Sequence, residues 1–421
     1  MISKEKFLAI SSVGVQYVGL FALFKLLSTH LESMIFAKYL LFNAAVNLIL
    51  GLPFTGVQQA ITRFGSGGDA VRAHNVMTIA VVQSAIAASL IALILFSISI
   101  MPSAQELEVR YQSSFAFAFA LTEALKLYVL AYENALMRRK AYLILTVSEY
   151  SAKFLLVSVL LAFNLASFFN LVFSLAVSNV IVFFIFTRGS KFNWDSLRLW
   201  SLLRSPLSLQ ILHFAVPVAC WSIFGWLRDM SGRYVVDALL TKVDVAGFAV
   251  LTTLTTLIPG LINALVGNYY IPIVYAEHNA GKCNVEKNMN RITLRLLLLG
   301  AFIVTLAIFA SDLFVVIASS EKYRFVAIYL PYTLTAYFVF MVAMVASTEL
   351  YAKGKANSLL LPNVISGLVG IGSLYFFISS RGFTGGVIGF FVTYVSYAIS
   401  VLLLLVYYRS GHRAADSMDA K

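Results

Sequence analysis

The sequence predicts an all-α polytopic membrane protein with about twelve transmembrane helices in two six-helix lobes related by an internal repeat. The observations behind this are an apolar composition, an uneven distribution of basic residues between loops, and a likeness between the two halves. Of 421 residues, 60% are hydrophobic and 12% are charged, and the mean hydropathy is +0.86. Since a soluble domain carries about 25% charged residues, lipid must be the solvent for much of this chain. The apolar stretches do not alternate strictly, which argues against a transmembrane β-barrel.

The apolar stretches define the predicted spans. The first follows Lys4 and Lys6, contains Lys25, and lacks a cleavage site of the small-x-small kind, so we expect an uncleaved span rather than a signal peptide. Charged residues interrupt the fourth, fifth and seventh spans. The twelve predicted spans cover residues 7–27, 36–61, 76–101, 113–136, 141–163, 167–187, 208–236, 245–272, 292–318, 325–350, 357–378 and 385–408.

The loop charges predict the orientation of these spans. With both termini in the cytoplasm, 20 of the 31 Lys and Arg residues fall on the cytoplasmic side, six fall on the opposite side, and five lie within spans. This asymmetry is what the positive-inside rule requires of a protein in the bacterial inner membrane. The formal net charge of +12 therefore reflects cytoplasmic loops and intramembrane cations, and it does not indicate nucleic-acid binding.

One polar connection predicts the domain organisation. The segment KFNWDSLRLWSLLRSP, between the sixth and seventh spans, alternates Trp and Leu with charged residues, a pattern typical of a short helix in the membrane interface. We therefore predict an N-lobe over residues 1–190, a linker helix over 191–206 and a C-lobe over 207–421.

The two halves resemble each other. FAKYLLFNAAVNLILGLP (36–53) and VAGFAVLTTLTTLIPGLI (245–262) share an aromatic residue near the start and a Gly/Pro break. Glu133, which is followed by Arg139 and Lys140, recurs as Glu349, which is followed by Lys353 and Lys355. The distance along the sequence between these two groups is similar to the distance between the two apolar segments. Internal duplication with the binding site at the repeat interface is typical of secondary transporters.

Ionisable residues within the spans are the candidate functional residues. Each costs roughly 2.5–3.5 kcal/mol near the bilayer centre, so each must be paired, hydrated in a cavity, or close enough to an interface to reach water. Glu149 and Lys153 stand four residues apart, which predicts an ion pair on one helix face. Lys25 and Arg228 have no opposite charge at helical spacing toward the membrane centre, so we expect them to face a cavity.

The predicted cationic cavity has six members. Arg63, at the end of the second span, is a further candidate for an anionic headgroup, or else a positive-inside anchor. The candidate substrate-binding residues are Lys25, Arg63, Lys126, Lys153, Arg228 and Arg233.

The sequence offers no catalytic or metal-binding motif. The two cysteines, Cys220 and Cys283, have no ligand spacing for zinc. The glycine-rich GSGGD (65–69) lacks the Lys-Ser/Thr of a nucleotide P-loop. We predict no catalytic residues, no metal and no cofactor.

Three segments carry a resemblance to a known family. They are GLPFTGVQQAITRF closing the second span, YENALMRRKAY after the fourth, and WLRDMSGRYVVDALLTKVDVAGFAV at the seventh and the start of the eighth. With the twelve spans and the 6+6 split, the chain resembles the O-antigen and polysaccharide flippases (Wzx-type) of the multidrug/oligosaccharidyl-lipid/polysaccharide (MOP) exporter superfamily.

This resemblance implies a function. Such proteins move an undecaprenyl-diphosphate-linked oligosaccharide from the cytoplasmic to the periplasmic leaflet by alternating access, with a cationic cavity for the diphosphate and acidic sugars. Lys25, Arg228 and Arg233 occupy the positions we expect to bind it. The resemblance also implies coupling to a proton or sodium gradient, for which Glu123, Glu149 and Asp229 are candidates, and polysaccharide polymerase and ligase as partners.

Two alternatives remain open. A multidrug/cation antiporter of the same superfamily would favour excess carboxylate, whereas the intramembrane candidate residues are five cations against four carboxylates when Glu133 is included. A polysaccharide polymerase or ligase is an enzyme of another class, and it would need a long periplasmic loop that this chain lacks. We therefore expect a transporter, not an enzyme.

Overall fold

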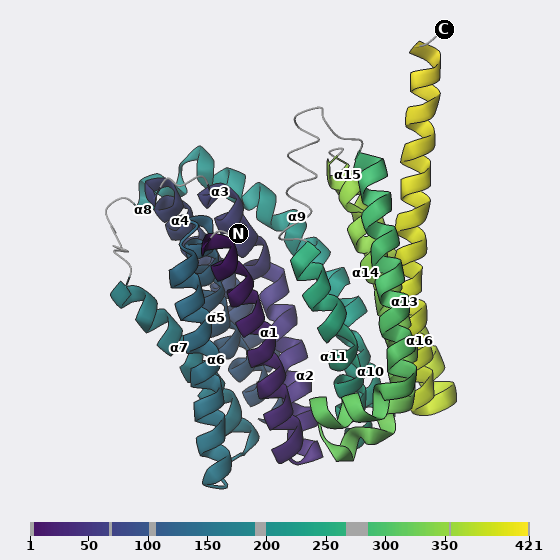
Figure 1. Ribbon diagram of the computed structural model, residues 1–421. Coiled ribbons are helices and arrows are strands. Elements are labelled where there is room, and N and C mark those ends of the chain that lie inside the picture. The colour runs from purple at the N-terminus through teal and green to yellow at the C-terminus, as the bar shows by residue number, and fades with distance from the viewer. Residues whose placement is uncertain are drawn as a thin grey trace. The chain divides into compact units, whose positions relative to one another are not determined.

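The helical spans dominate the computed structural model (Figure 1), which describes residues 4–66, 70–100, 107–189, 199–266, 285–352 and 355–419. Every regular element in these ranges is helical. Eleven of the described helices are long and apolar enough to cross a membrane. A helix satisfies its backbone hydrogen bonds within the segment, which lipid cannot do for it. The predicted fold class, an all-α polytopic membrane protein, is confirmed.

The contacts divide the chain into two compact units, Met1–Ile223 and Phe224–Lys421. The first contains α1 (Lys4–His30), α2 (Ser33–Ile49), α3 (Thr55–Gly65), α4 (Ala70–Ile100), α5 (Leu107–Ala135), α6 (Arg139–Ala162), α7 (Phe168–Gly189), α8 (Leu199–Leu203) and most of α9 (Pro206–Asp229).

A π-helical turn joins α2 to α3. This turn, η1 (Leu50–Phe54), has the sequence LGLPF. The proline lacks a backbone N–H and disturbs the α-helical ladder, and a π turn absorbs that disturbance. The hydroxyl of Thr55 donates to the carbonyl oxygen of Leu50 over 3.1 Å. The second predicted span, 36–61, is thus one interrupted helix.

Helix α5 forms the centre of the first unit and packs against α3, α4 and α7, while α1 packs on α6. Its buried face carries alanines four residues apart: Ala116, Ala120 and Ala124. Small side chains at this spacing let helix backbones approach closely in a membrane. Phe42 of α2 fills the space beside them, with its ring 5.6 Å from that of Phe119 and 5.4 Å from that of Phe168.

The second unit contains the end of α9, α10 (Ser231–Leu239), α11 (Lys242–Leu265), α13 (Val285–Ala318), η5 (Glu321–Tyr329), α14 (Leu330–Ala346), α15 (Thr348–Ala352), η6 (Ala356–Leu359) and α16 (Leu360–Asp419). Thr241 and Asp244 form a reciprocal capping box that begins α11.

Helix α16 is a hairpin of two antiparallel helices. The backbone leaves helical geometry at Gly382, where φ is +58° and ψ is −137°. Beyond this point the chain returns alongside itself, because the hydroxyl of Ser373 donates to the carbonyl oxygen of Gly389 over 3.3 Å. The two predicted spans 357–378 and 385–408 are therefore confirmed, and the eleven long described helices provide twelve spans.

The two units pack their helices in the same order. In the first unit, α1 lies on α6 and α5 lies on both α3 and α7. In the second unit, α10 lies on the first half of α16, where Gly232 meets Leu374. Helix α14 lies on α11 and, through Tyr337 and Tyr394, on the second half of α16. In each unit, therefore, the first span packs on the fifth, the second packs on the fourth, and the fourth packs on the sixth. An internal repeat predicts this shared order.

The predicted linker lies partly outside the described residues, which omit 190–198. The boundaries predicted for the two lobes and the linker therefore stay predictions. The contacts divide the chain within the seventh span, and the start of α9 packs in the first unit. There the side-chain nitrogen of Gln83 donates to the carbonyl oxygen of Ser208 over 2.9 Å.

Candidate functional site

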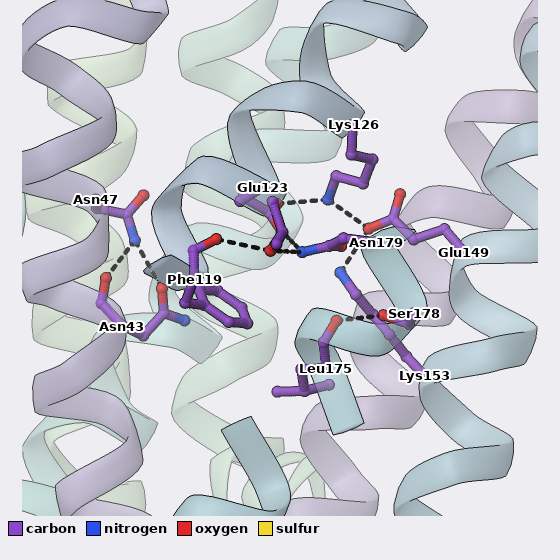
Figure 2. Close-up of polar contacts among 11 residues, drawn as sticks. Asn43, Asn47, Phe119, Glu123, Lys126, Glu149, Lys153, Leu175, Ser178 and Asn179 are labelled. Atoms are coloured by element: carbon purple, nitrogen blue, oxygen red, sulfur yellow. Dashed lines mark hydrogen bonds and ion pairs between the residues drawn. The ribbon is translucent and has the colours of Figure 1, made fainter. Parts of the chain in front are cut away.

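A pocket of about 300 Å³ opens among α1, α2, α5, α6 and α7 of the first unit. Its wall is polar for the interior of a membrane protein, with amide, phenol, hydroxyl and charged groups. Figure 2 shows part of this wall, with asparagines of α2 on one side and a charged cluster on the other. The polar lining residues are Gln16, Tyr39, Asn43, Asn47, Glu123, Lys126, Tyr142, Thr146, Glu149, Tyr150 and Lys153.

Four charged side chains form one connected cluster, which we call the charged tetrad: Glu123 and Lys126 of α5 with Glu149 and Lys153 of α6. The ammonium of Lys126 donates to Glu123 and lies 2.7 Å from Oε1 of Glu149. The Nζ atom of Lys153 lies 2.5 Å from the same Glu149 oxygen. The predicted pair between Glu149 and Lys153 is therefore confirmed.

Helix α7 completes the cluster. The side-chain nitrogen of Asn179 donates to Oε2 of Glu123 over 2.8 Å (Figure 2). The four charged side chains are between 4% and 18% exposed. Because desolvated charges are tolerated only when they are paired and hydrogen-bonded, these bonds explain how α5 and α6 carry them within the membrane.

The tetrad carries no net charge, since two lysines face two glutamates. Lys126 and Lys153 were predicted to serve as cavity cations, and the structure places both at a pocket. Their ammonium groups, however, bind carboxylates of the protein itself. The pocket therefore offers an incoming group hydrogen-bonding partners more than uncompensated positive charge.

The opposite wall presents an amide pair. The side-chain nitrogen of Asn47 donates to Oδ1 of Asn43 over 2.7 Å and to the carbonyl oxygen of Asn43 over 2.8 Å (Figure 2). The two residues are one helical turn apart, so both face the pocket. Amides next to phenols can donate and accept hydrogen bonds in several directions.

A second polar cluster lies in the second unit around Arg228, in the last turn of α9. Its Nε lies 2.8 Å from Oδ1 of Asp229, its Nη2 lies 3.1 Å from Oδ2, and its Nη1 donates to Asn363 over 2.9 Å. Tyr394 donates to Asp229 over 2.9 Å. The guanidinium carbon also lies 4.6 Å from the ring centroid of Phe340, a cation–π distance.

This arrangement gives Arg228 a partner that helical spacing does not predict. Arg228 was expected to face a cavity because no opposite charge stands at helical spacing toward the membrane centre, and in the structure its carboxylate partner is the next residue, Asp229. Side chains adjacent in a helix do not normally face each other. Here α9 ends at Asp229 and α10 begins at Ser231, with φ of −122° at Met230 between them. The end of the helix allows neighbouring residues to meet.

The other predicted cations are not among the residues that line this pocket. Lys25 is half-buried in α1, and Arg233 is 8% exposed in α10. Arg63 is exposed at the end of α3, with its guanidinium 4.8 Å from the ring centroid of Phe214. It lines a shallow groove of about 390 Å³. Lys25, Arg63, Lys126 and Lys153 thus belong to the first unit, while Arg228 and Arg233 belong to the second.

Several site residues were missed at the sequence level. Asn43, Asn47 and Asn179 are uncharged amides within spans, and a search restricted to charges overlooks them. Tyr394 and Asn363 have no distinguishing spacing in the sequence. In the part of the chain that the structure describes, no group of three His, Cys, Asp or Glu side chains could hold a metal ion.

Comparisons with known proteins identify the fold. No family model and no curated protein matches the sequence. An inward-facing multidrug resistance MATE family transporter of the MOP superfamily matches with a TM-score of 0.61 at 15% identity, covering 99% of this chain and 96% of that one. The lipid II flippase MurJ, in an inward closed conformation, matches with a TM-score of 0.66 at 11% identity, covering 95% and 87%.

A third structure gives the same result. A mutant MATE transporter of Vibrio cholerae matches with a TM-score of 0.61 at 12% identity, covering 98% of this chain and 96% of that one. At such low identities the likeness establishes the fold. The chain has the fold of MOP-superfamily transporters and flippases, over nearly its whole length.

Proposed function

We propose that this protein is a flippase that moves an undecaprenyl-diphosphate-linked oligosaccharide from the cytoplasmic to the periplasmic leaflet by alternating access. The observation that carries the proposal is the pocket of the first unit, with its amides, phenols and internally neutralised tetrad. The shared fold supports a transporter of this kind, the apolar composition supports a membrane location, and the distribution of basic residues between the loops supports cytoplasmic termini.

The pocket wall suits sugar hydroxyl groups. A hydroxyl both donates and accepts a hydrogen bond, and the side chains of Asn43, Asn47 and Thr146 do the same. Tyr39 and Tyr142 add aromatic surface with polar ends. Small-molecule pockets span about 300–1,000 Å³, so a pocket of about 300 Å³ would hold part of an oligosaccharide headgroup.

The multidrug antiporter is the second candidate, because the MATE transporters share the fold equally well. The charged tetrad argues against it. A cationic drug needs an available carboxylate, yet Lys126 binds both Glu123 and Glu149. A cation would have to displace a buried lysine, and separating a buried pair is costly.

The remaining elements of the proposal concern charge. Arg228 and Arg233 of the second unit are candidates for neutralising the diphosphate because guanidinium groups bind phosphate bidentately, and Lys25 of the first unit is a further candidate. Arg228 would have to exchange its bonds to Asp229 for bonds to phosphate oxygens. Glu123, Glu149 and Asp229 are the candidates for coupling to a proton or sodium gradient. Polysaccharide polymerase and ligase would act on the flipped product.

Gene deletion followed by analysis of the lipid-linked glycan tests the function. We expect complete units to accumulate on the cytoplasmic leaflet and surface polysaccharide to disappear, with rescue by the wild type. The double variant Lys25→Ala/Arg228→Ala should not rescue. The matched control Lys242→Ala/Arg381→Ala removes two of the six Lys and Arg residues that the loop charges assign to the periplasmic side, and it should rescue.

The opposite result is equally clear. Normal surface polysaccharide in the deletion strain, together with hypersensitivity to cationic drugs, would favour the antiporter. Equal membrane levels of all variants, measured by immunoblot, are needed before any failure to rescue is assigned to transport.

A further inference from the structure

The second unit has a groove of about 670 Å³ between α13 and the segment formed by η5 and α14. Its walls are strongly exposed apolar side chains: Phe309 is 83% exposed, Ile328 69% and Tyr332 61%. Other apolar side chains of α13 are exposed as well, including Leu298, which is 65% exposed. This is the surface expected of a helix in contact with lipid.

One carboxylate interrupts this surface. Asp312 lines the groove and is 60% exposed, although it lies within a membrane-spanning helix. The predicted span 292–318 contains Asp312, yet no charge pattern within that span singles this residue out. An ionisable residue on a lipid-facing surface is costly unless a partner meets it, so its presence at the groove needs an explanation.

An arginine from η5 provides part of that explanation. The Nη2 atom of Arg324 lies 3.2 Å from Oδ2 of Asp312, and its Nη1 atom lies 3.0 Å from Oε1 of Glu321. We call these three residues the charged rim: Asp312, Glu321 and Arg324. All three are more than half exposed, and together they carry one net negative charge. An apolar groove thus ends in a rim that presents both signs of charge.

This combination matches a phospholipid whose headgroup also carries both signs. We propose that the groove and the charged rim bind phosphatidylethanolamine. One acyl chain would lie along Phe309, Ile328 and Tyr332. The ammonium group would donate to the carboxylate of Asp312, and the phosphate would accept from Arg324. Charge-assisted hydrogen bonds of this kind are the stronger ones.

The rim chemistry discriminates between lipids. Phosphatidylcholine has a quaternary ammonium without N–H donors, so it cannot hydrogen-bond to Asp312. Phosphatidylglycerol is anionic and has no ammonium group, and the net negative charge of the rim disfavours it. Both can place an acyl chain in the groove, so the headgroup decides the preference. The proposal does not depend on the transport substrate.

Native mass spectrometry of the full-length protein with the three lipids, with identical acyl chains, tests the proposal. We expect phosphatidylethanolamine to be retained preferentially. Asp312→Asn should weaken its binding about tenfold, the effect of losing one hydrogen bond to a charged group. Asp237→Asn is the matched control, because Asp237 binds Lys242 in the same unit but does not line the groove.

A second variant separates the groove from the rim. Thr335→Trp places bulk in the groove without changing charge, and it should reduce retention of all three lipids. Melting temperatures in detergent confirm that each variant is folded. Equal retention of the three lipids by the wild type, or an unchanged preference in Asp312→Asn, would overturn the proposal. A polyprenyl phosphate is added as a fourth lipid in a separate competition, and its preferential retention over phosphatidylethanolamine would also overturn the proposal, since the occupant would then be a different lipid.

Discussion

The Nζ atom of Lys126 lies 2.7 Å from Oε1 of Glu149, which joins α5 to α6 inside the first unit (Figure 2). The same ammonium also binds Glu123, its neighbour one turn away on α5. Lys126 is therefore the side chain that holds the two carboxylates of the charged tetrad together. Because it is only 4% exposed, its removal would leave buried negative charge without compensation.

We first predict that Lys126→Met destabilises the protein strongly. Removing one partner of a buried ion pair costs about 3–5 kcal/mol, because the other charge stays buried. The double variant Lys126→Met/Glu123→Gln restores the charge balance and should recover most of the stability. Denaturant titrations of the purified proteins in detergent measure both free energies of unfolding.

The matched control for this prediction is Lys242→Met. Lys242 pairs with Asp237, and their side chains are 43% and 25% exposed. Such an exposed pair contributes at most about 1 kcal/mol. A double variant of the tetrad no more stable than Lys126→Met alone would mean that something other than charge balance determines the effect.

The second prediction concerns the amide wall. Asn43→Ala and Asn47→Ala should each reduce transport about tenfold while leaving the melting temperature close to that of the wild type, because each removes hydrogen bonds that a sugar hydroxyl would use. Surface polysaccharide in the deletion strain measures transport. Asn170→Ala, at an exposed site near the start of α7, should have no effect. Full transport by both pocket variants would exclude the amides from substrate binding.

The third prediction concerns Arg228. Arg228→Lys should impair transport although it keeps the charge, because an ammonium cannot reproduce the two bonds to Asp229 or the stacking on Phe340. Tyr394→Phe removes one neutral bond to Asp229 and should have a smaller effect. Both are measured by complementation at matched membrane levels, with the exposed Arg381→Lys as the control. Full complementation by Arg228→Lys would show that a positive charge is sufficient at this position.

The fold was predictable because lipid restricts the choice of backbone structure. Each apolar stretch of about 20 residues had to be a spanning helix. The sequence also allowed 357–378 and 385–408 to be predicted as two separate spans, because a short segment that contains glycine lies between them. The Gly/Pro break at the end of 36–53 indicated where the second span is interrupted, but its π-helical form could not be predicted. It depends on how α2 and α3 pack against α4 and α5.

The site was only partly predictable, and the reason is geometric. Spacing on one helix identified the pair of Glu149 and Lys153, because residues four apart share a face. The bond from Lys126 to Glu149 depends on the relative rotation of α5 and α6, which no local pattern specifies. Asp312 was overlooked since its partner, Arg324, lies in another element, twelve residues away.

The final prediction concerns the α16 hairpin, in which Gly385 packs against the backbone of the preceding helix. A Cβ atom built there would lie 1.9 Å from the carbonyl oxygen of Phe377, so Gly385→Ala must force the helices apart. We expect low expression and a lower melting temperature. Gly372→Ala is the matched control, because a Cβ atom there meets nothing within 4 Å. It should be neutral or stabilising by about 0.5–1 kcal/mol, since alanine is the better helix former. A Gly385→Ala protein that melts like the wild type would show that the two helices lie farther apart than the hairpin requires.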